Sequence, residues 1–160
     1  MSLAVIYSRA LSGMQAPLVE VEAHLANGLP AFNIVGLPDT EVKESRDRVR
    51  AAIIQSGFEF PAKKITVNLA PADLPKESGR FDLPIAVGIL AASGQIQHQH
   101  LAQYELAGEL ALSGQIRPIR GAVAMAWEGA QAQRAFILPP ENALQAALLH
   151  TATVYGADTL

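Results

Sequence analysis

The sequence predicts an α+β domain in which helices pack on a mixed β-sheet. Early in the chain, apolar and polar residues alternate over short segments, which is the period of a half-buried strand. Later, strand-like segments alternate with helical ones, which is typical of helices packed on a sheet. The chain has 160 residues, of which 50% are hydrophobic and 17% charged, enough for one hydrophobic core. We therefore expect a single domain spanning residues 1–160.

The expected elements follow the order βββαβαββαβαβ along the chain. Strands are expected at 3–10, 18–25, 31–35, 65–69, 104–112, 115–119, 135–138 and 153–155. Helices are expected at 39–56, 83–93, 121–133 and 141–150. Asp39 or Thr40 is expected to cap the first helix, and Gly57 to end it. Asn27-Gly28 predicts a hairpin between the second and third strands.

The stretch from residue 65 to residue 94 organises the rest of the chain. Its strand ends at Pro71 and Pro75, because proline cannot donate to a sheet ladder. A charged loop at 76–80 follows, and the Asp82 carboxylate is expected to cap the next helix by accepting backbone N–H groups. That helix is apolar on nearly every face, which predicts that it is buried inside the domain.

The net charge of −3 hides a concentration of positive charge in the middle of the chain. Residues 43–80 carry a net charge of +3, whereas 1–42 and 81–160 each carry −3. Local charge decides whether a surface attracts a polyanion. The candidate nucleic-acid-binding residues are Lys43, Arg46, Arg50, Lys63, Lys64, Lys76 and Arg80. Such side chains would neutralise phosphates without reading sequence, but a solvated helix face laced with Glu44 and Asp47 has the same pattern.

The sequence lacks the residues that several classes of function require. No cysteine is present, which excludes disulfides and thiolate metal sites. No GxxxxGK(S/T) loop is present to cradle nucleotide phosphates, so we expect no ATP hydrolysis by this chain alone. His98 and His100 have no third ligand placed by spacing, which favours a solvated connection over a metal site. The N-terminus has no basic region before its apolar run, so we expect a cytoplasmic chain without a signal peptide or membrane partner.

Ser78, two residues after Lys76, leaves one catalytic alternative open, a Ser–Lys dyad. Such a dyad needs a desolvated lysine with a lowered pKa within hydrogen-bond reach of the hydroxyl. The loop at 76–80 is polar and is expected to be exposed, where a lysine stays protonated. A solvent-facing turn is therefore the favoured interpretation.

Long segments of the chain resemble the ComM/YifB family, bacterial AAA+ ATPases related to the magnesium-chelatase I subunit. The similar segments are LAVIYSRALSGMQAPLVEVEAHLANGLPAFNIVGLPDTEVKESRDRVRAAI, PAKKITVNLAPADLPKESGRFDLPIAVGILAASG, GELALSGQIRPIRGA and ILPPEN. In that family these residues form the N-terminal domain, and the ATPase module follows it. The resemblance thus implies an N-terminal domain without its ATPase module. It implies no cofactor in this chain, with ATP and Mg bound by the missing module.

The same domain is similar to the proteolytic domain of Lon, which has the ribosomal protein S5 domain 2-like fold. By ungapped comparison, Phe81 stands near the position of the Lon serine, and Val123 stands near that of the Lon lysine. Neither side chain supplies the hydroxyl nucleophile or the amine base that the chemistry needs. No lysine follows Lys76 in the chain. The resemblance therefore implies that the fold is kept and peptidase activity is lost, so no catalytic residue is assigned.

The family resemblance also implies a role and partners. ComM-type proteins are similar to hexameric DNA helicases that promote branch migration during natural transformation. A Lon-like domain without the dyad also occurs in the RadA recombination ATPase, where it helps assembly and DNA contact. We therefore expect a non-catalytic domain that aids ring assembly and guides DNA. Its expected partners are the AAA+ module of the same protein, neighbouring subunits of the ring, and single-stranded or branched DNA.

Two other interpretations remain beside this one. The first is a purely structural assembly domain without DNA contact, which would be marked by an exposed apolar patch. The second is a residual serine peptidase built on Ser78.

Overall fold

The computed structural model describes residues 3–148 and 152–160. Within them, the strands are β1 (Leu3–Arg9), β2 (Leu18–Ala26), β3 (Ala31–Val35), β4 (Lys64–Ala70), β5 (Tyr104–Leu106), β6 (Glu109–Leu110), β7 (Ile116–Arg117), β8 (Ala135–Leu138) and β9 (Val154–Gly156). The helices are α1 (Thr40–Lys43), α2 (Ser45–Gln55), α3 (Asp82–Ala92), α4 (Ala122–Gln131) and α5 (Pro140–Ala146). Short 3-10 helices form at η1 (Gly79–Phe81) and η2 (Leu101–Gln103).

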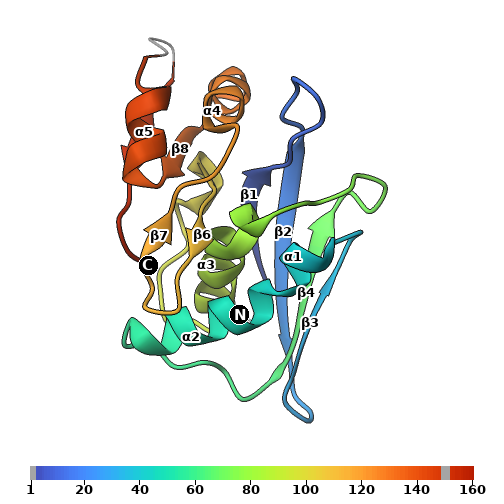
Figure 1. The fold of residues 1–160 in the computed structure, drawn as a ribbon. Helices are drawn as coiled ribbons and strands as arrows, with labels where there is room; N and C mark the ends of the chain where they lie inside the picture. Colours follow the sequence, from blue (N-terminus) through green and yellow to red (C-terminus); the bar gives the residue numbers. More distant parts are fainter. Residues whose placement is uncertain (1–2, 149–151) are drawn as a thin grey trace.

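A seven-stranded mixed sheet, in the order β3-β4-β2-β1-β5-β8-β9, forms the centre of the described residues (Figure 1). β1, β2 and β4 are antiparallel neighbours, and β3 is added to the edge of β4 in parallel. On the other side of β1, strands β5, β8 and β9 continue in parallel. β6 and β7 form a separate antiparallel pair. The predicted fold class, a mixed sheet with packed helices, is confirmed.

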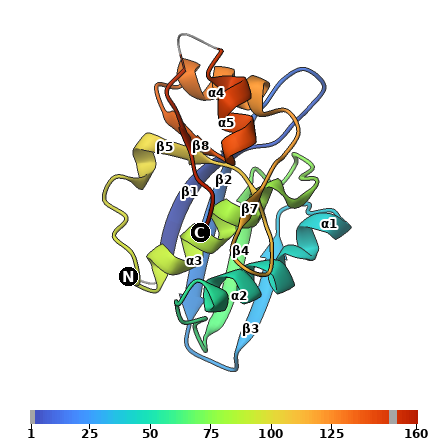
Figure 2. The ribbon, with the colours of Figure 1, turned by 60° about the vertical axis from the view of Figure 1, so that its left-hand side comes forward.

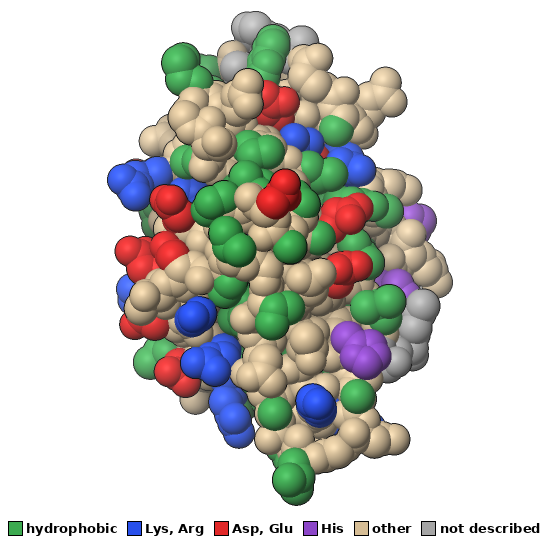
Figure 3. Space-filling model, turned by 90° about the vertical axis from the view of Figure 1, so that its right-hand side faces the viewer, with side chains coloured by type: hydrophobic (Ala, Val, Ile, Leu, Met, Phe, Trp, Pro, Cys, Tyr) green, Lys and Arg blue, Asp and Glu red, His purple; other side chains and the backbone are tan. Residues whose placement is uncertain are grey.

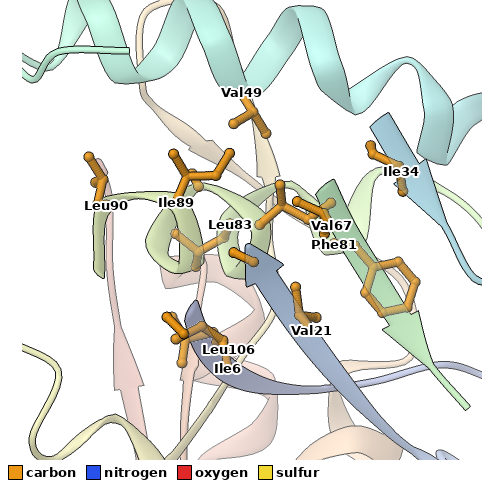
Figure 4. Close-up of a cluster of buried hydrophobic side chains, with 14 of the residues drawn as sticks. Ile6, Val21, Ile34, Val49, Val67, Phe81, Leu83, Ile89, Leu90 and Leu106 are labelled. Carbon is orange, nitrogen blue, oxygen red and sulfur yellow. The ribbon is translucent and has the colours of Figure 1, made fainter. Parts of the chain in front are cut away.

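The helices divide between the two parts of the sheet (Figure 2). α3 packs on β1 and β2, and α2 packs on α3. α4 and α5 pack on one another and on β8. The larger hydrophobic core lies between α2, α3 and the sheet, and Figure 4 shows Ile6, Val21 and Ile89 within it. A smaller core under α4 includes Met125 and Phe136.

α3 and the strand before it confirm the predicted organising stretch. Ten of the eleven residues of α3 are buried, as expected for a helix that is apolar on nearly every face. Pro84 lies in its first turn, where the missing N–H costs little. Gly88 allows α3 to approach β2 closely, because a Cβ at this position would lie 3.2 Å from the Cβ of Ala23.

The predicted hairpin at Asn27-Gly28 is wrong. β4 lies between β2 and β3 in the sheet, and it pairs with both of them. The Asn-Gly turn reverses the chain locally, but the pairing of a strand edge is set by the segment that completes the sheet and buries its apolar face. That segment comes more than 30 residues later in the chain.

Two predicted elements are each split in the structure. The helix expected at 39–56 breaks at Glu44 into α1 and α2, and Asp39 caps α1 by accepting the Val42 N–H at 2.8 Å. The strand expected at 104–112 divides into β5 and β6, because the chain leaves the main sheet between them. There, the Gly108 N–H donates to the Arg80 carbonyl at 3.0 Å.

The last described helix, α5, is shorter than expected. α5 ends at Ala146, and the predicted helix end at residue 150 lies outside the described residues. Among the helices described, none is long and apolar enough to cross a membrane.

Candidate functional site

Five of the seven candidate nucleic-acid-binding side chains are exposed. They are Lys43, Arg46, Arg50, Lys63 and Lys64. Lys43 ends α1, whereas Arg46 and Arg50 lie four residues apart on one side of α2. The other two lie at the start of β4. Whether these five bind nucleic acid stays a prediction.

Contacts bring three of these cations to the edge strand β3. The Lys63 carbonyl accepts the Ala31 N–H at 3.3 Å, and Lys64 is the register partner of Ala31. The Arg50 guanidinium lies 5.0 Å from the ring centroid of Phe60. That ring lies 5.7 Å from the ring of Phe32 in β3. The exposed cations therefore border one edge of the sheet.

Figure 3 shows how charge is distributed on the face that includes this edge. Lysine and arginine side chains gather toward its lower left, and aspartate and glutamate side chains lie among and above them. The surface is therefore mixed in sign, and both the nucleic-acid interpretation and the solvated-helix interpretation remain compatible with it.

The expectation that Lys76 and Arg80 are exposed is wrong. Their relative exposures are 0% and 4%. The loop that carries them is held inside the domain by backbone hydrogen bonds, since the Lys76 N–H donates to the Leu37 carbonyl at 3.2 Å and the Asp39 N–H donates to the Lys76 carbonyl at 3.0 Å. The polar sequence predicts an exposed loop, but tertiary pairing buries Lys76 and Arg80, while Glu77 stays exposed.

Lys76 is a buried amine with a neutral partner. Its Nζ donates to the Pro71 carbonyl. Burial lowers the pKa of Lys76 below its ordinary value of 10.5, and the charge of Asp73 acts in the opposite direction. Between the lowered pKa and 10.5, the unfolded chain binds more protons than the folded chain, so stability rises with pH in that window.

Lys76→Met is expected to remove this rise. In urea unfolding of the wild type between about pH 7 and pH 10, the deprotonation of Lys76 should increase the free energy of unfolding as pH rises. The variant should gain less over the same range. Lys64→Met, which changes an exposed lysine, is the matched control and should follow the wild type. Equal pH dependence in wild type and Lys76→Met would contradict the assignment.

Ser78 and Lys76 do not form the dyad that a peptidase would need. The Ser78 Oγ accepts the Arg80 Nε–H at 3.0 Å, and the lysine amine is directed to Pro71. The two positions compared with Lon also differ in burial. Phe81 is fully buried in the core, whereas Val123 is 43% exposed on α4.

The predicted capping role of Asp82 is wrong, and the structure gives this residue another role. The helix begins at Asp82 without a side-chain cap. Its buried carboxylate instead accepts hydrogen bonds from Arg48 Nε at 2.6 Å, from the Leu110 N–H at 3.0 Å and from the Ser45 hydroxyl. Burial raises the pKa of the Asp82 carboxyl, while these three donors act in the opposite direction. Asp82 therefore ties α3 to α2 and β6.

A second buried carboxylate, that of Glu105, joins β5 to β1 and to the segment before β8. Glu105 in β5 accepts Arg9 Nε at 2.7 Å, Arg9 Nη2 at 2.9 Å and Arg134 Nη1 at 3.1 Å. The remaining Arg9 Nη1 donates to the Ala16 carbonyl at 3.0 Å. None of these three residues is among the candidates that the sequence suggests, although a glutamate inside an apolar strand segment is a usable signal, since such a residue is rarely buried without a partner.

A metal site finds no support within residues 3–148 and 152–160, where no group of three or more metal-ligating side chains occurs. A hollow of about 830 Å³ is lined in part by Asn27, Lys63 and Gln95. Its Lys63 Nζ donates to the Asn27 Oδ1 at 2.9 Å.

Comparison with known proteins places this chain in a family. The family model described as subunit ChlI of Mg-chelatase matches residues 21–142, which is most of the chain. The chain belongs to this ChlI family. It is 54% identical over 160 residues to competence protein ComM of Haemophilus influenzae and 56% identical over 160 residues to the uncharacterized protein YifB of Salmonella typhimurium. An uncharacterized protein of Mycobacterium bovis is 37% identical over 161 residues.

These alignments cover 100% of this chain but only 31% of ComM and 32% of the other two proteins. This ChlI-family chain therefore spans about a third of the length of the curated relatives it matches. The predicted ComM/YifB resemblance is confirmed.

Proposed function

We propose that this ChlI-family chain is the non-catalytic N-terminal domain of a bacterial AAA+ ATPase that processes DNA, and that it helps to guide DNA into the ring and to assemble the ring. The 54% sequence identity between this chain and a protein named for competence supports a role in natural transformation, with branch migration as the activity of the whole ATPase. The Lon-like, S5 domain 2-like architecture belongs to the same proposal. ATP and Mg would be bound by the part of the protein outside these residues.

The observation that carries the DNA-guiding role is the set of five exposed cations, of which three border β3 and two, Lys43 and Arg46, lie on α1 and α2. The backbone edge of β3 and the side chains of α2 lie next to them, so a single strand could follow this edge while its phosphates are neutralised. Basic side chains bind phosphates with little dependence on base sequence. Lys76 and Arg80 take no part, because both are buried.

A second observation supports the assembly role. Val123 and Trp127 are exposed one helical turn apart on α4, and Leu144 and Leu148 are exposed four residues apart on and just after α5. α4 and α5 pack on one another, and α5 also packs on β9 at the sheet edge opposite β3. Exposed apolar side chains on two helices that pack together favour a protein–protein contact. DNA and subunit contacts would then use opposite edges of one sheet.

The test is fluorescence anisotropy of this chain with labelled single-stranded and forked DNA. If all five cations contact a single strand, the slope of log affinity against log salt should be about −3.5, and affinity should fall roughly a hundredfold between about 50 mM and 200 mM salt. Arg46→Glu combined with Lys63→Glu should weaken binding and bring the slope to about −2. Both residues are exposed, so the fold should persist.

Arg117→Glu is the matched control, since it reverses an exposed charge on β7, away from β3. It should bind as the wild type does. Equal affinity of the folded double variant and the wild type would reject the basic edge as the DNA site. No binding at low salt would leave the assembly role as the function of this domain.

A further inference from the structure

Arg80 is a buried cation that has no carboxylate partner among the described residues. Its Nε donates to the Ser78 Oγ at 3.0 Å, and its Nη1 donates to the Arg120 carbonyl at 2.9 Å and to the Met125 Sδ at 3.4 Å. All three acceptors are neutral. The other buried arginine, Arg9, is paired with a carboxylate at 2.7 Å. Glu77 acts on this guanidinium through its charge but makes no hydrogen bond with it, and burying a cation without a bonded anion is costly, so such an arginine indicates an anion that completes the site.

The remaining nitrogen of this guanidinium is free to bind. Nη2 has no hydrogen-bond partner within residues 3–148 and 152–160. Arg80 lines a cavity of about 310 Å³, together with Ser78 and the exposed Arg120. The Ser78 Oγ already accepts from the backbone N–H and the Nε–H of Arg80, so its own proton remains available to donate. Two cations and a hydroxyl donor therefore face one small cavity.

The backbone at this cavity is strained in a way that is common at ligand sites. Ser78 has φ of 69° and ψ of −179°, a region that is essentially reserved for glycine. This conformation directs the hydroxyl to Arg80 and places the residue at the cavity. A strained non-glycine residue of this kind persists only where the surrounding structure holds it, and such residues cluster at binding sites.

The other charged groups of the cavity limit the size of its ligand. Glu41 and Glu109 also line it. The charge of Glu109 raises the pKa of Arg48, and a Cβ at Gly79 would lie 2.5 Å from Glu109 Oε1, so this carboxylate lies against the backbone between Ser78 and Arg80. A long polyanion in the cavity would be repelled by these carboxylates, whereas a single compact anion needs room only beside the two guanidinium groups.

We propose that this cavity binds one small oxyanion, either a phosphate group or a carboxylate, held by Arg80 Nη2, the Ser78 hydroxyl and the Arg120 guanidinium. The site is separate from the basic edge at β3. An arginine fork is well matched to both kinds of oxyanion, because each offers two oxygens to parallel N–H donors. The two sources are distinguished by experiment.

The test is calorimetric titration of the chain with inorganic phosphate and, in a second arm, with acetate, at matched ionic strength. We expect one phosphate per chain and a phosphate-dependent rise in melting temperature. Arg120→Gln keeps the backbone carbonyl that Arg80 needs, so it should fold and lose affinity by about tenfold. Binding of acetate with the same sensitivity to Arg120→Gln would assign the site to a carboxylate.

A second variant separates binding from stability. Ser78→Gly relieves the backbone strain, so it should melt at a higher temperature than the wild type without ligand and yet bind phosphate more weakly. Arg117→Gln is an exposed control outside the cavity and should bind as the wild type does. Failure of both anions to bind, or affinity unchanged in Arg120→Gln and Ser78→Gly, would overturn the proposal.

Discussion

Glu105→Ala is expected to lower the free energy of unfolding by about 3–5 kcal/mol. The Glu105 side chain is fully buried, and it is the anion that compensates Arg9, whose side chain is only 7% exposed. Without it, Arg9 keeps the Ala16 carbonyl as a neutral partner, and a buried charge is left uncompensated. Arg134 suffers less, because it is partly exposed and its guanidinium lies 4.0 Å from the ring centroid of Tyr7.

The measurement is urea unfolding at neutral pH, with the slope of the transition used to verify that the same cooperative unit unfolds. Arg9→Met combined with Glu105→Leu is the informative control, since replacing both partners with apolar groups of similar volume is often close to neutral. We expect this double variant to recover much of the loss. A loss below about 1 kcal/mol for Glu105→Ala would show that the pair contributes no more than an exposed ion pair does.

Asp82→Ala is the second large effect, again with an expected loss of about 3–5 kcal/mol in the free energy of unfolding. The carboxylate is fully buried and accepts from Arg48, Ser45 and the backbone of Leu110. Its removal leaves the Leu110 N–H without an acceptor and leaves Arg48 without its anion. Each buried donor that loses its partner carries the full cost of its desolvation.

Asp82→Asn is the matched control, because it keeps the size of the side chain and an acceptor oxygen but removes the charge. It should lose less than Asp82→Ala, because an acceptor for the Leu110 N–H remains, and less than Arg48→Met, which leaves a fully buried carboxylate without its cation. Chemical denaturation of the three variants gives the order directly. If Asp82→Asn costs as much as Asp82→Ala, then the acceptor for the Leu110 N–H contributes nothing that can be measured.

Neither carboxylate was recognised from the sequence with its observed role. Asp82 stands just before a helix, where a carboxylate commonly caps, so local pattern favoured a cap. The structure instead fills its oxygens with donors from α2 and β6, 34 and 28 residues away in the chain. Arg9 and Glu105 are separated by 96 residues. No local rule connects such positions.

In the candidate site, too, local features follow from the sequence, whereas burial depends on the tertiary structure. The positions of Arg46 and Arg50 on one side of α2 follow from helical spacing, and both side chains and Lys43 are exposed. The loop at 76–80 has an equally polar composition, but it is paired with Leu37 and Asp39, and its Lys76 and Arg80 side chains are buried. Composition describes which groups a segment carries, whereas burial depends on what packs over it.

The sequence by itself determined the secondary elements whose signals are local. The alternation at 65–69, the apolar helix that follows, the cap at Asp39 and the strand at 135–138 all form where they were expected. These depend on side-chain period and on backbone groups within a few residues. Only the tertiary structure decided that β4 separates β2 from β3, that Asp82 meets Arg48, and that Arg80 lines a cavity. Strand order and buried charge pairing arise when segments distant in the sequence pack together and exclude water. The free energy of such contacts depends on both segments, so no local pattern in either one predicts it.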